Sequence, residues 1–378
     1  MGSGLLRAAA VAACAAAAGL AAGDGSVRVF LTTSDQKHLL AEQPPLSLGP
    51  PIPGAAAIRV EPDTEYQTIV GYGAAITDAA AWVIHSAQPD LYDDLMNLLF
   101  KPYSQAFSGP HHPAAASASC SDALAQQCDG ARRASVGKCW ICEGVHQHAL
   151  TPACSAAELS AFCTGTALSL GLSMVRLHIG VSDFSRSYQP GNLTYADTPG
   201  DWALTQFSTA HDDAYILPVL RRARQLNPAL KIVASPWTPP LWLKTGGEIG
   251  GGTLIDTAQV YETYAEYFLR FVQDYIRKGV TVDYLTLQNE PGHAGCGTMP
   301  CMLLSAAQEG RLATILGKKL AAAGLANTTR ILGYDHNWGK QAGVPISGPA
   351  YPMELLNNAS VSPYIAGTAW HCYGESSC

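Results

Sequence analysis

The chain has 378 residues, of which 48% are hydrophobic and only 14% are charged, so it is long enough to bury a large globular core. Its formal net charge is −7, and its 23 Lys and Arg residues are scattered along the chain rather than clustered. A protein that binds nucleic acid needs a basic patch on its surface, so we exclude nucleic acid as a partner.

The first 23 residues have the pattern of a secretory signal peptide. Arg7 precedes an Ala-rich apolar run, residues 8–22, that ends in small residues. No later segment reaches the roughly 18 apolar residues that a membrane span needs. We therefore expect a secreted protein or one of the lysosomal or vacuolar lumen, where the ten cysteines after Cys14 would pair as disulfides, with their connectivity open. Three sequons for N-glycosylation fit the same compartment: Asn192, Asn327 and Asn358.

In chain order, the first predicted elements are short strands at residues 27–32 and 58–60, separated by a Pro-rich stretch at 44–53. We assign residues 24–65 to the N-terminal strands of a side β-sandwich domain. From residue 66 onward, apolar strand candidates alternate with helical patterns, which predicts an α/β fold with a parallel sheet. The six strand candidates lie at residues 68–72, 173–178, 231–234, 282–287, 330–333 and 365–371.

Two amphipathic helices lie between these strands. They are predicted at residues 214–226 and 257–278, the second with Asp256 as its N-cap and Gly279 as its stop. Six strands with helices between them indicate an incomplete (β/α)8 TIM-type barrel, about six of its eight strands, over residues 66–378.

A Cys-rich insertion at residues 101–166 interrupts this alternation. Its spacing of Cys139, Cys142 and nearby His residues fits no standard zinc pattern, although a zinc site is one of three interpretations. The others are a loop stapled by disulfides and a translated non-coding segment. The disulfide-stapled loop and the translated non-coding segment both stay open as interpretations.

A polar run, Asn289-Glu290-Pro291, follows the strand candidate at 282–287 after one residue, Gln288. In a parallel barrel, this end of a strand carries the chemistry. A carboxylic acid held there can protonate a glycosidic oxygen, and the neighbouring Asn amide can hold a sugar hydroxyl next to the reacting carbon. Alternatively, the run is an ordinary strand end with a surface carboxylate.

Similar segments follow the first and third barrel strands. Small residues at 71–81 let a backbone approach a ligand, and Asp78 can accept hydrogen bonds from sugar hydroxyls; alternatively, Asp78 is a helix N-cap. Trp237 can stack on a sugar face, whereas Trp242 also suits packing. Arg176 on the second strand could face the barrel interior beside Glu290 and keep it ionised. His178, on the same strand, is more typical of a core histidine.

Together these segments resemble the glucosylceramidases of glycoside hydrolase family 30. The likeness covers residues 27–100 and 167–373, and it rests on five segments: 71–80, 173–185, 195–199, 235–244 and 289–291. A sixth segment, Trp370-His371-Cys372-Tyr373, resembles the family's sixth-strand motif but has Cys372 in place of an aromatic residue.

The resemblance implies a role for each matching residue. Glu290 would be the acid/base, Asn289 its partner at the sugar 2-hydroxyl, Asp78 and Trp237 glucose-binding residues, and Tyr373 a residue that approaches the nucleophile. Arg176 and His371 would support the site. No cofactor and no metal are implied. We expect Asp78, Trp237, Asn289, Glu290 and Tyr373 to meet at one barrel mouth, because each follows or ends a parallel strand.

One departure from the family concerns the nucleophile. A retaining glycosidase needs a second carboxylate about 5 to 5.5 Å from the first. In the family this residue lies on the seventh strand, beyond the position of Tyr373, whereas this sequence ends at Cys378. Glu375 follows the sixth strand too soon to replace it. The expectation is a chain truncated before the nucleophile and inactive by itself.

The resulting hypothesis is a retaining β-glucosidase that hydrolyses glucosylceramide to glucose and ceramide, with possible transient contact to a membrane surface or an activator protein. Two alternatives stay open. One is a non-catalytic pseudoenzyme that binds a glucoside, and the other is a related hydrolase of β-glucan or xylan.

Overall fold

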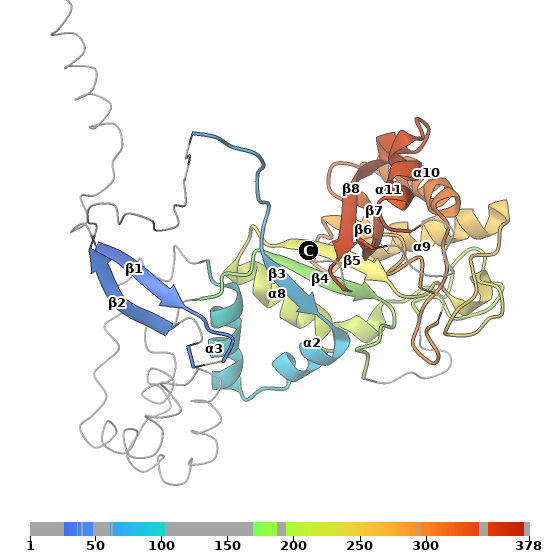
Figure 1. Cartoon of the computed structure of the whole chain (residues 1–378). Coiled ribbons are helices and arrows are strands. Elements are labelled where there is room, and N and C mark those ends of the chain that lie inside the picture. The colour runs from blue at the N-terminus through green and yellow to red at the C-terminus, as the bar shows by residue number, and fades with distance from the viewer. Residues whose placement is uncertain are drawn as a thin grey trace, which may run out of the picture. The chain divides into compact units, whose positions relative to one another are not determined.

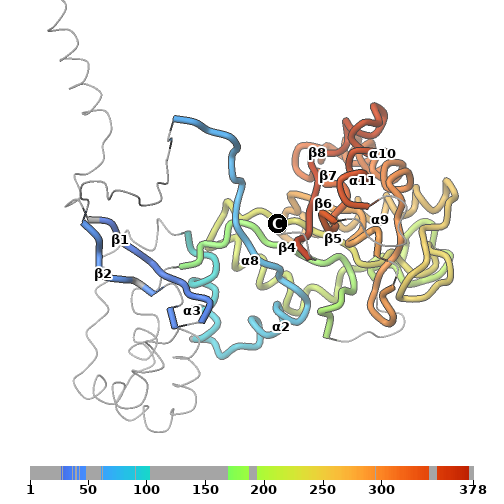
Figure 2. The backbone as a smooth tube through the Cα atoms, in the orientation of Figure 1, coloured from blue at the N-terminus to red at the C-terminus, as the bar shows by residue number. Residues whose placement is uncertain are grey.

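The computed structural model describes residues 26–35, 37–38, 41–47, 61, 63–102, 169–186, 194–293, 295–339 and 347–373. The chain divides into two compact units, and the larger one contains the α/β part that begins at Ile69 (Figure 1, Figure 2). The expected signal peptide, the strand at 58–60 and nearly all of the Cys-rich insertion lie outside the described residues. Asn192 and Glu375 do as well.

The N-terminal unit contains an antiparallel pair of strands, β1 (Ser26–Leu31) and β2 (Ala41–Ser47). The first agrees with the predicted strand at 27–32. The second lies partly in the Pro-rich stretch that we had predicted to be a connection, so that prediction was wrong. Pairing jumps from Val27↔Leu46 to Val29↔Gln43, which places Pro44 and Pro45 in a β-bulge. A bulge tolerates proline because the ladder needs no N–H donor there.

The larger unit is built on a parallel sheet of six strands, and this confirms the predicted α/β fold. The strands are β3 (Gly73–Ile76), β4 (Met174–Ile179), β5 (Lys231–Pro236), β6 (Tyr284–Thr286), β7 (Arg330–Asn337) and β8 (Ile365–His371). They pair in chain order, β3-β4-β5-β6-β7-β8. The sheet curves, with the helices on its outer side (Figure 1). Within the described part of the chain, β3 and β8 are its edges and the barrel is not closed.

The helices that follow the strands have the bounds α2 (Asp78–His85), α3 (Pro89–Phe100), η1 (Ala210–Asp213), α8 (Ile216–Leu226), η2 (Leu241–Leu243), α9 (Ala258–Arg277), α10 (Ala306–Ala322), α11 (Ala350–Asn357) and η3 (Ser362–Tyr364). The cap predicted for α9 was off by one residue. The Thr257 hydroxyl accepts from the Val260 N–H at 3.3 Å, whereas Asp256 pairs with Arg311 at 2.9 Å. Among the described helices, none is both long enough and apolar enough to cross a membrane.

The core confirms the predicted apolar face of α9. Six apolar side chains along this helix are buried to 1% exposure or less: Val260, Tyr264, Tyr267, Phe268, Phe271 and Tyr275. The ring of Tyr195 stacks on Phe271 at 5.8 Å, which joins the segment after β4 to this helix. Burial of a large side chain contributes roughly 1.5–3 kcal/mol, so α9 is a main source of stability for the sheet.

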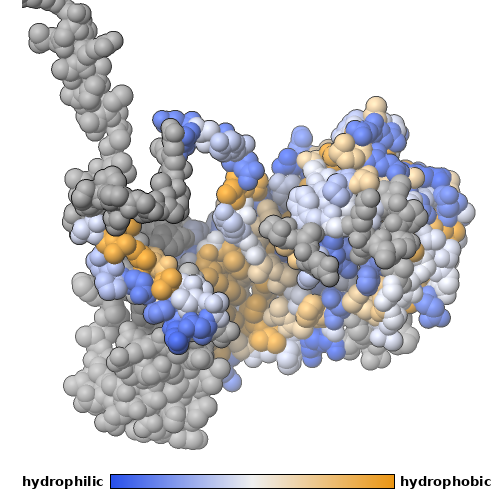
Figure 3. Space-filling model, viewed as in Figure 1, coloured by the Kyte–Doolittle hydropathy of each residue, from blue (hydrophilic) through white to orange (hydrophobic). Residues whose placement is uncertain are grey.

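The first barrel strand lies later than predicted. We expected it at residues 68–72, but Ile69, Val70 and Tyr72 are more than half exposed, and β3 is formed by Gly73–Ile76. Close approach to β4 explains the shift, because a Cβ on Gly73 would lie 1.7 Å from the carbonyl oxygen of Met174. Figure 3 shows the resulting apolar surface where the chain enters β3.

Two other strands run further than predicted. Strand β5 continues from the predicted residues 231–234 through Pro236, and β7 continues from 330–333 through Asn337. The extensions carry Ser235 and Asp335 into the sheet. Both side chains are fully or almost fully buried, and both belong to the site described next.

Candidate active site

The segment after β6 is tied to both neighbouring strands. The Asn289 N–H donates to Pro236 O at 2.7 Å, and the Glu290 N–H donates to Asp335 O at 3.0 Å. The Gln288 amide donates to Trp237 O at 2.7 Å. Glu290 itself has φ +50°, a left-handed conformation that costs a residue with a side chain roughly 1–2 kcal/mol. Such strain is typical of functional sites, and here the flanking hydrogen bonds fix the direction of the Glu290 side chain.

Asp335, on β7, is the centre of the polar network. It is 2% exposed. Its Oδ2 accepts from Arg176 Nη2 at 2.8 Å and from the hydroxyls of Ser235 and Thr286, each at 2.7 Å, while its Oδ1 lies 2.9 Å from His371 Nε2. Burial opposes ionisation, but the Arg176 charge and the His371 hydrogen bond outweigh it and hold the pKa of Asp335 well below its usual value. Asp335 is therefore a buried carboxylate with its acceptor sites filled.

Sequence reasoning missed Asp335. A signal was present, because Asp335-His336-Asn337 follows the apolar residues 330–333, the same pattern that identified Glu290. The polar residues continue the strand instead of following it, and a buried carboxylate on a strand gives no sign of its partners. Its Arg176 partner lies 159 positions away in the sequence.

The imidazole of His371 bridges two carboxylates. Its Nδ1 lies 3.0 Å from Oε1 of Glu290, and its Nε2 lies 2.9 Å from Oδ1 of Asp335. Burial would lower the pKa of His371, but the hydrogen bonds with both carboxylates raise it to about 9. At neutral pH, His371 is an imidazolium that donates to Glu290 and to Asp335.

Glu290 is correspondingly ionised. Burial would raise the pKa of Glu290, but the hydrogen bond with His371 and the electrostatic influence of the neighbouring His336, His371 and His293 outweigh burial and lower it. A general acid needs its proton at the working pH. In this resting arrangement Glu290 is a base, and the nearest proton is the one that His371 shares with it.

Arg176 does not lie where we predicted. We expected it beside Glu290, but its guanidinium pairs with Asp335 and donates to Asn289 Oδ1 at 2.8 Å. The reason is that Asp335 is a fully buried counter-ion, whereas Glu290 is already hydrogen-bonded to His371. Arg176 thus fixes the Asn289 amide with its oxygen inward and its NH2 group available as a donor.

Trp237 follows β5 and is 9% exposed. The Arg176 guanidinium stacks on its indole at 4.7 Å, so one ring face is covered by a cation. Trp242 has a packing role, since its indole N–H donates to Ala196 O at 2.8 Å and its ring meets Trp202 edge-on at 4.9 Å. The two tryptophans of this segment therefore differ in their contacts.

Asp78 is not the N-cap of α2. Thr77 has that role, accepting from the Ala80 N–H at 3.1 Å. The Asp78 carboxylate is 3% exposed, accepts from the Tyr215 hydroxyl and from the Arg186 N–H, and lies 3.1 Å from His211 Nε2. Burial opposes ionisation, but these hydrogen bonds, led by that of His211, hold the pKa of Asp78 below its usual value. The alternative that Asp78 is a helix cap is therefore wrong.

The strand directions place these residues at one edge of the sheet. Asp78, Trp237, Asn289 and Glu290 each follow the carboxyl end of a strand, and all six strands are parallel. Tyr373 follows β8 at the same end, where its N–H donates to Asn337 Oδ1 at 3.2 Å and its side chain is 72% exposed. The ring of His178 is buried among core residues and pairs with Gly180 O, as expected for a core histidine.

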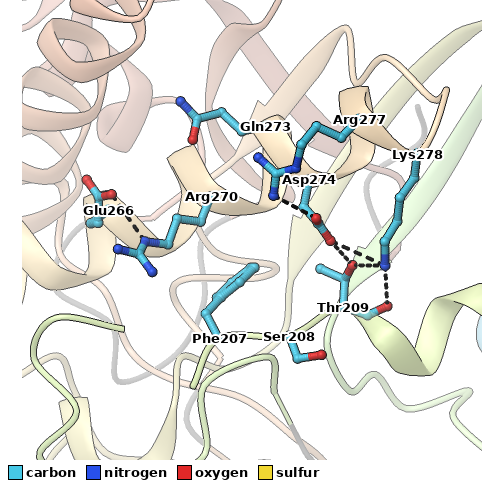
Figure 4. A pocket seen from close by; sticks show the side chains of 9 residues that line it. All are labelled: Phe207, Ser208, Thr209, Glu266, Arg270, Gln273, Asp274, Arg277 and Lys278. Carbon is cyan, nitrogen blue, oxygen red and sulfur yellow. Dashed lines mark hydrogen bonds and ion pairs between the residues drawn. The ribbon is translucent and has the colours of Figure 1, made fainter. Parts of the chain in front are cut away.

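A polar pocket of about 420 Å³ lies elsewhere, between residues 207–209 and the C-terminal half of α9 (Figure 4). Its cations are already paired. Lys278 contacts the Thr209 hydroxyl at 2.8 Å, and Arg277 contacts Asp274 at 2.7 Å. Because it contains none of the residues around Glu290, we assign it no part in the chemistry.

Comparison with known proteins places this chain in a family. Residues 142–378, more than half of the chain, match the glycosyl hydrolase family 30 TIM-barrel domain. The chain belongs to glycoside hydrolase family 30. The resemblance inferred from the motifs is confirmed at this level.

Relatives within the family carry different names. An endo-1,6-β-D-glucanase of Neurospora crassa is 35% identical over 217 residues, 56% of this chain and 42% of the relative. The lysosomal acid glucosylceramidase of Mus musculus is 29% identical over 210 residues, 53% of this chain and 38% of the relative. The solved structure of the endo-β1,6-glucanase BT3312 matches with a TM-score of 0.65 at 24% identity, covering 93% of this chain and 61% of that chain. The chain thus spans about half the length, or less, of these curated relatives.

Proposed function

We propose that the protein hydrolyses β-glucosidic bonds, with Glu290 as the general acid and base. The observation that carries the proposal is the position of Glu290. It follows a barrel strand in a strained conformation and shares a proton with His371 at 3.0 Å. Its own backbone N–H is bonded to β7, and that of the preceding Asn289 is bonded to β5. A carboxyl group in this setting can give a proton to a leaving oxygen and then take one from water.

The surrounding residues have distinct roles in this proposal. Asn289 presents its NH2 group to the sugar hydroxyl beside the reacting carbon, because Arg176 holds its oxygen. Trp237 forms a wall for the sugar ring. Asp78 accepts hydrogen bonds from sugar hydroxyls, which replace one of its present hydrogen-bond donors. Asp335 does not serve as the second carboxylate of the reaction, since four donors occupy it. It positions Arg176 and His371 instead.

His371 supplies the proton that Glu290 lacks at rest. With its pKa raised to about 9, His371 is charged at neutral pH and contacts Glu290 directly. A bound glucoside displaces water from this site, and the loss of water disfavours the separate charges of the His371 imidazolium and the Glu290 carboxylate. The shared proton therefore moves from His371 toward Glu290. Glu290 would then be the acid that bond cleavage needs.

For the substrate, we propose a β-1,6-linked glucan. This revises the expectation of glucosylceramide, and it is supported by the 35% identity to the Neurospora crassa endo-1,6-β-D-glucanase. Glucosylceramide is the second candidate, supported by the likeness to the mouse lysosomal enzyme. Membrane-surface or activator contact belongs to that second candidate only. A secreted or lumenal location fits both.

Hydrolysis of pustulan, a β-1,6-glucan, and of glucosylceramide tests the proposal. The assay compares the 378-residue chain with the protein carrying any coding sequence that follows the Cys378 codon. We expect glucose oligomers from pustulan in the form that holds a second carboxylate near Glu290, and loss of this activity in Glu290→Gln. Cleavage of glucosylceramide alone would favour the second candidate. Full activity in Glu290→Gln would refute the assignment of Glu290.

A further inference from the structure

Three potential metal ligands converge at the ends of β6, β7 and β8. Glu290, His336 and His371 each offer one ligand atom, and these atoms all lie within 4.8 Å of one another. Oε1 of Glu290 is 3.0 Å from Nδ1 of His371 and 3.9 Å from Nδ1 of His336. Ligand atoms bound to one tetrahedral zinc ion lie roughly 3–3.5 Å apart, so movements of about 1 Å complete the set.

The chemistry of these ligands selects the metal. Two imidazoles and one carboxylate form the ligand set of zinc sites that keep a fourth position open. Calcium and magnesium prefer sites made of oxygen ligands alone, whereas imidazole suits zinc and its neighbours in the transition series. The ligand set therefore fits Zn²⁺.

The residues behind the ligands support the same interpretation. Metal-binding histidines usually donate their second ring nitrogen to a carboxylate, which fixes the ring. His371 does so through Nε2, at 2.9 Å from Asp335, and its Nδ1 is thereby directed at Glu290. His336 is fully buried, so its ring direction is fixed by packing, while the Glu290 side chain is 18% exposed and leaves a path for an ion.

We propose that Glu290, His336 and His371 form a Zn²⁺ site at the mouth of the sheet, with Asp335 as the carboxylate that orients His371. Binding of the ion displaces the Nδ1 proton of His371 to solvent. The metal binds the Glu290 oxygen that would otherwise protonate the glycosidic oxygen. Bound Zn²⁺ therefore blocks hydrolysis reversibly. This inhibitory consequence rests on the proposed function, whereas metal binding itself does not.

The test is calorimetric titration of the chain, freed of tags and stripped with EDTA, with ZnCl₂, followed by Co²⁺ absorption spectroscopy. We expect His336→Gln and Glu290→Gln each to weaken this site at least about 100-fold and to abolish its Co²⁺ ligand-field bands, because each removes one metal ligand. Asp335→Asn should weaken it about 10–100-fold, since it disturbs only the orientation of His371. His85→Gln, an exposed histidine on α2, is the matched control and should leave binding unchanged.

Two results would overturn the proposal. One is no Zn²⁺ binding, and the other is equal binding by the original chain, His336→Gln and Glu290→Gln, which would place the metal elsewhere, as in the Cys-rich segment 101–166. Circular dichroism without metal shows whether each variant is folded. If His336→Gln does not fold, Glu290→Gln decides, because its side chain is partly exposed. Zn²⁺ binding that needs these ligands, found together with no β-glucosidase activity in the form that holds a second carboxylate near Glu290, would refute the proposed function and leave the metal site standing.

Discussion

Glu309, in the first turn of α10, should make the stability of the protein fall as the pH rises. Its side chain is 1% exposed, and burial raises the pKa of this carboxyl from 4.5 to about 7. The folded protein therefore holds the proton more tightly than the unfolded chain. Stability from this group is fully present below about pH 4.5 and is lost as the pH passes through about 7.

The magnitude follows from the two pKa values. A tenfold change in proton affinity corresponds to about 1.4 kcal/mol, so the rise from 4.5 to about 7 corresponds to roughly 3 kcal/mol between acid and mildly alkaline pH. Glu309→Gln removes the charge but keeps an oxygen that can accept from the Tyr334 N–H, now 3.0 Å from Glu309 Oε1. The variant should lose this part of the pH dependence and be more stable than the original chain at about pH 8.

Urea unfolding, followed by circular dichroism at about pH 5 and about pH 8, measures the effect. Glu262→Gln on α9 is the matched control, because that side chain is 58% exposed and lies 3.5 Å from Lys319. It should leave the pH dependence unchanged. An equal fall in the free energy of unfolding for Glu309→Gln and the original chain would refute the reasoning.

Three further changes test the fold and the site. Asp335→Asn should cost roughly 3–5 kcal/mol in urea unfolding, because it removes the buried counter-ion of the partly buried Arg176 charge. A loss below about 1 kcal/mol would contradict a central role for Asp335. Gly73→Ala should prevent pairing of β3 with β4, since an added Cβ would lie 1.7 Å from Met174 O. Gly295→Ala is the control, because its added Cβ would meet nothing within 4 Å, and it should leave the melting temperature unchanged. Trp237→Ala should weaken binding of the glucose-like inhibitor isofagomine in calorimetry, while Trp242→Ala should lower stability and bind it normally; the reverse would exchange their roles.

The α/β fold was predictable because strand and helix periodicities alternate along the chain. The predicted strand at 365–371 coincides with β8, and the predicted apolar face of α9 is buried as expected. The errors fall where glycine or proline determines the bounds of a strand. Gly73 starts β3 because close contact excludes a larger residue, and Pro44 and Pro45 enter β2 through a bulge. Patterns of hydrophobicity detect neither effect.

The candidate site was predictable only in part. Motifs after strands indicated Asp78, Trp237, Asn289 and Glu290, and parallel pairing brings them to one edge. The pairing of Arg176 with Asp335 instead of Glu290, and the bridge made by His371, depend on burial depth and on side chains on or after four strands, β4, β6, β7 and β8, meeting. Such contacts join residues far apart in the sequence, so local patterns could not predict them.

The most direct test of the central claim, that Glu290 is the acid and base, is the dependence of the Glu290→Gln defect on the leaving group. Turnover is compared for pustulan, which needs a proton on its leaving oxygen, and for 2,4-dinitrophenyl β-glucoside, which does not. The protein carries any coding sequence that follows the Cys378 codon. We predict a loss of about 10²–10⁴-fold for pustulan and less than about 10-fold for the activated glucoside. Equal losses for both substrates would contradict the claim.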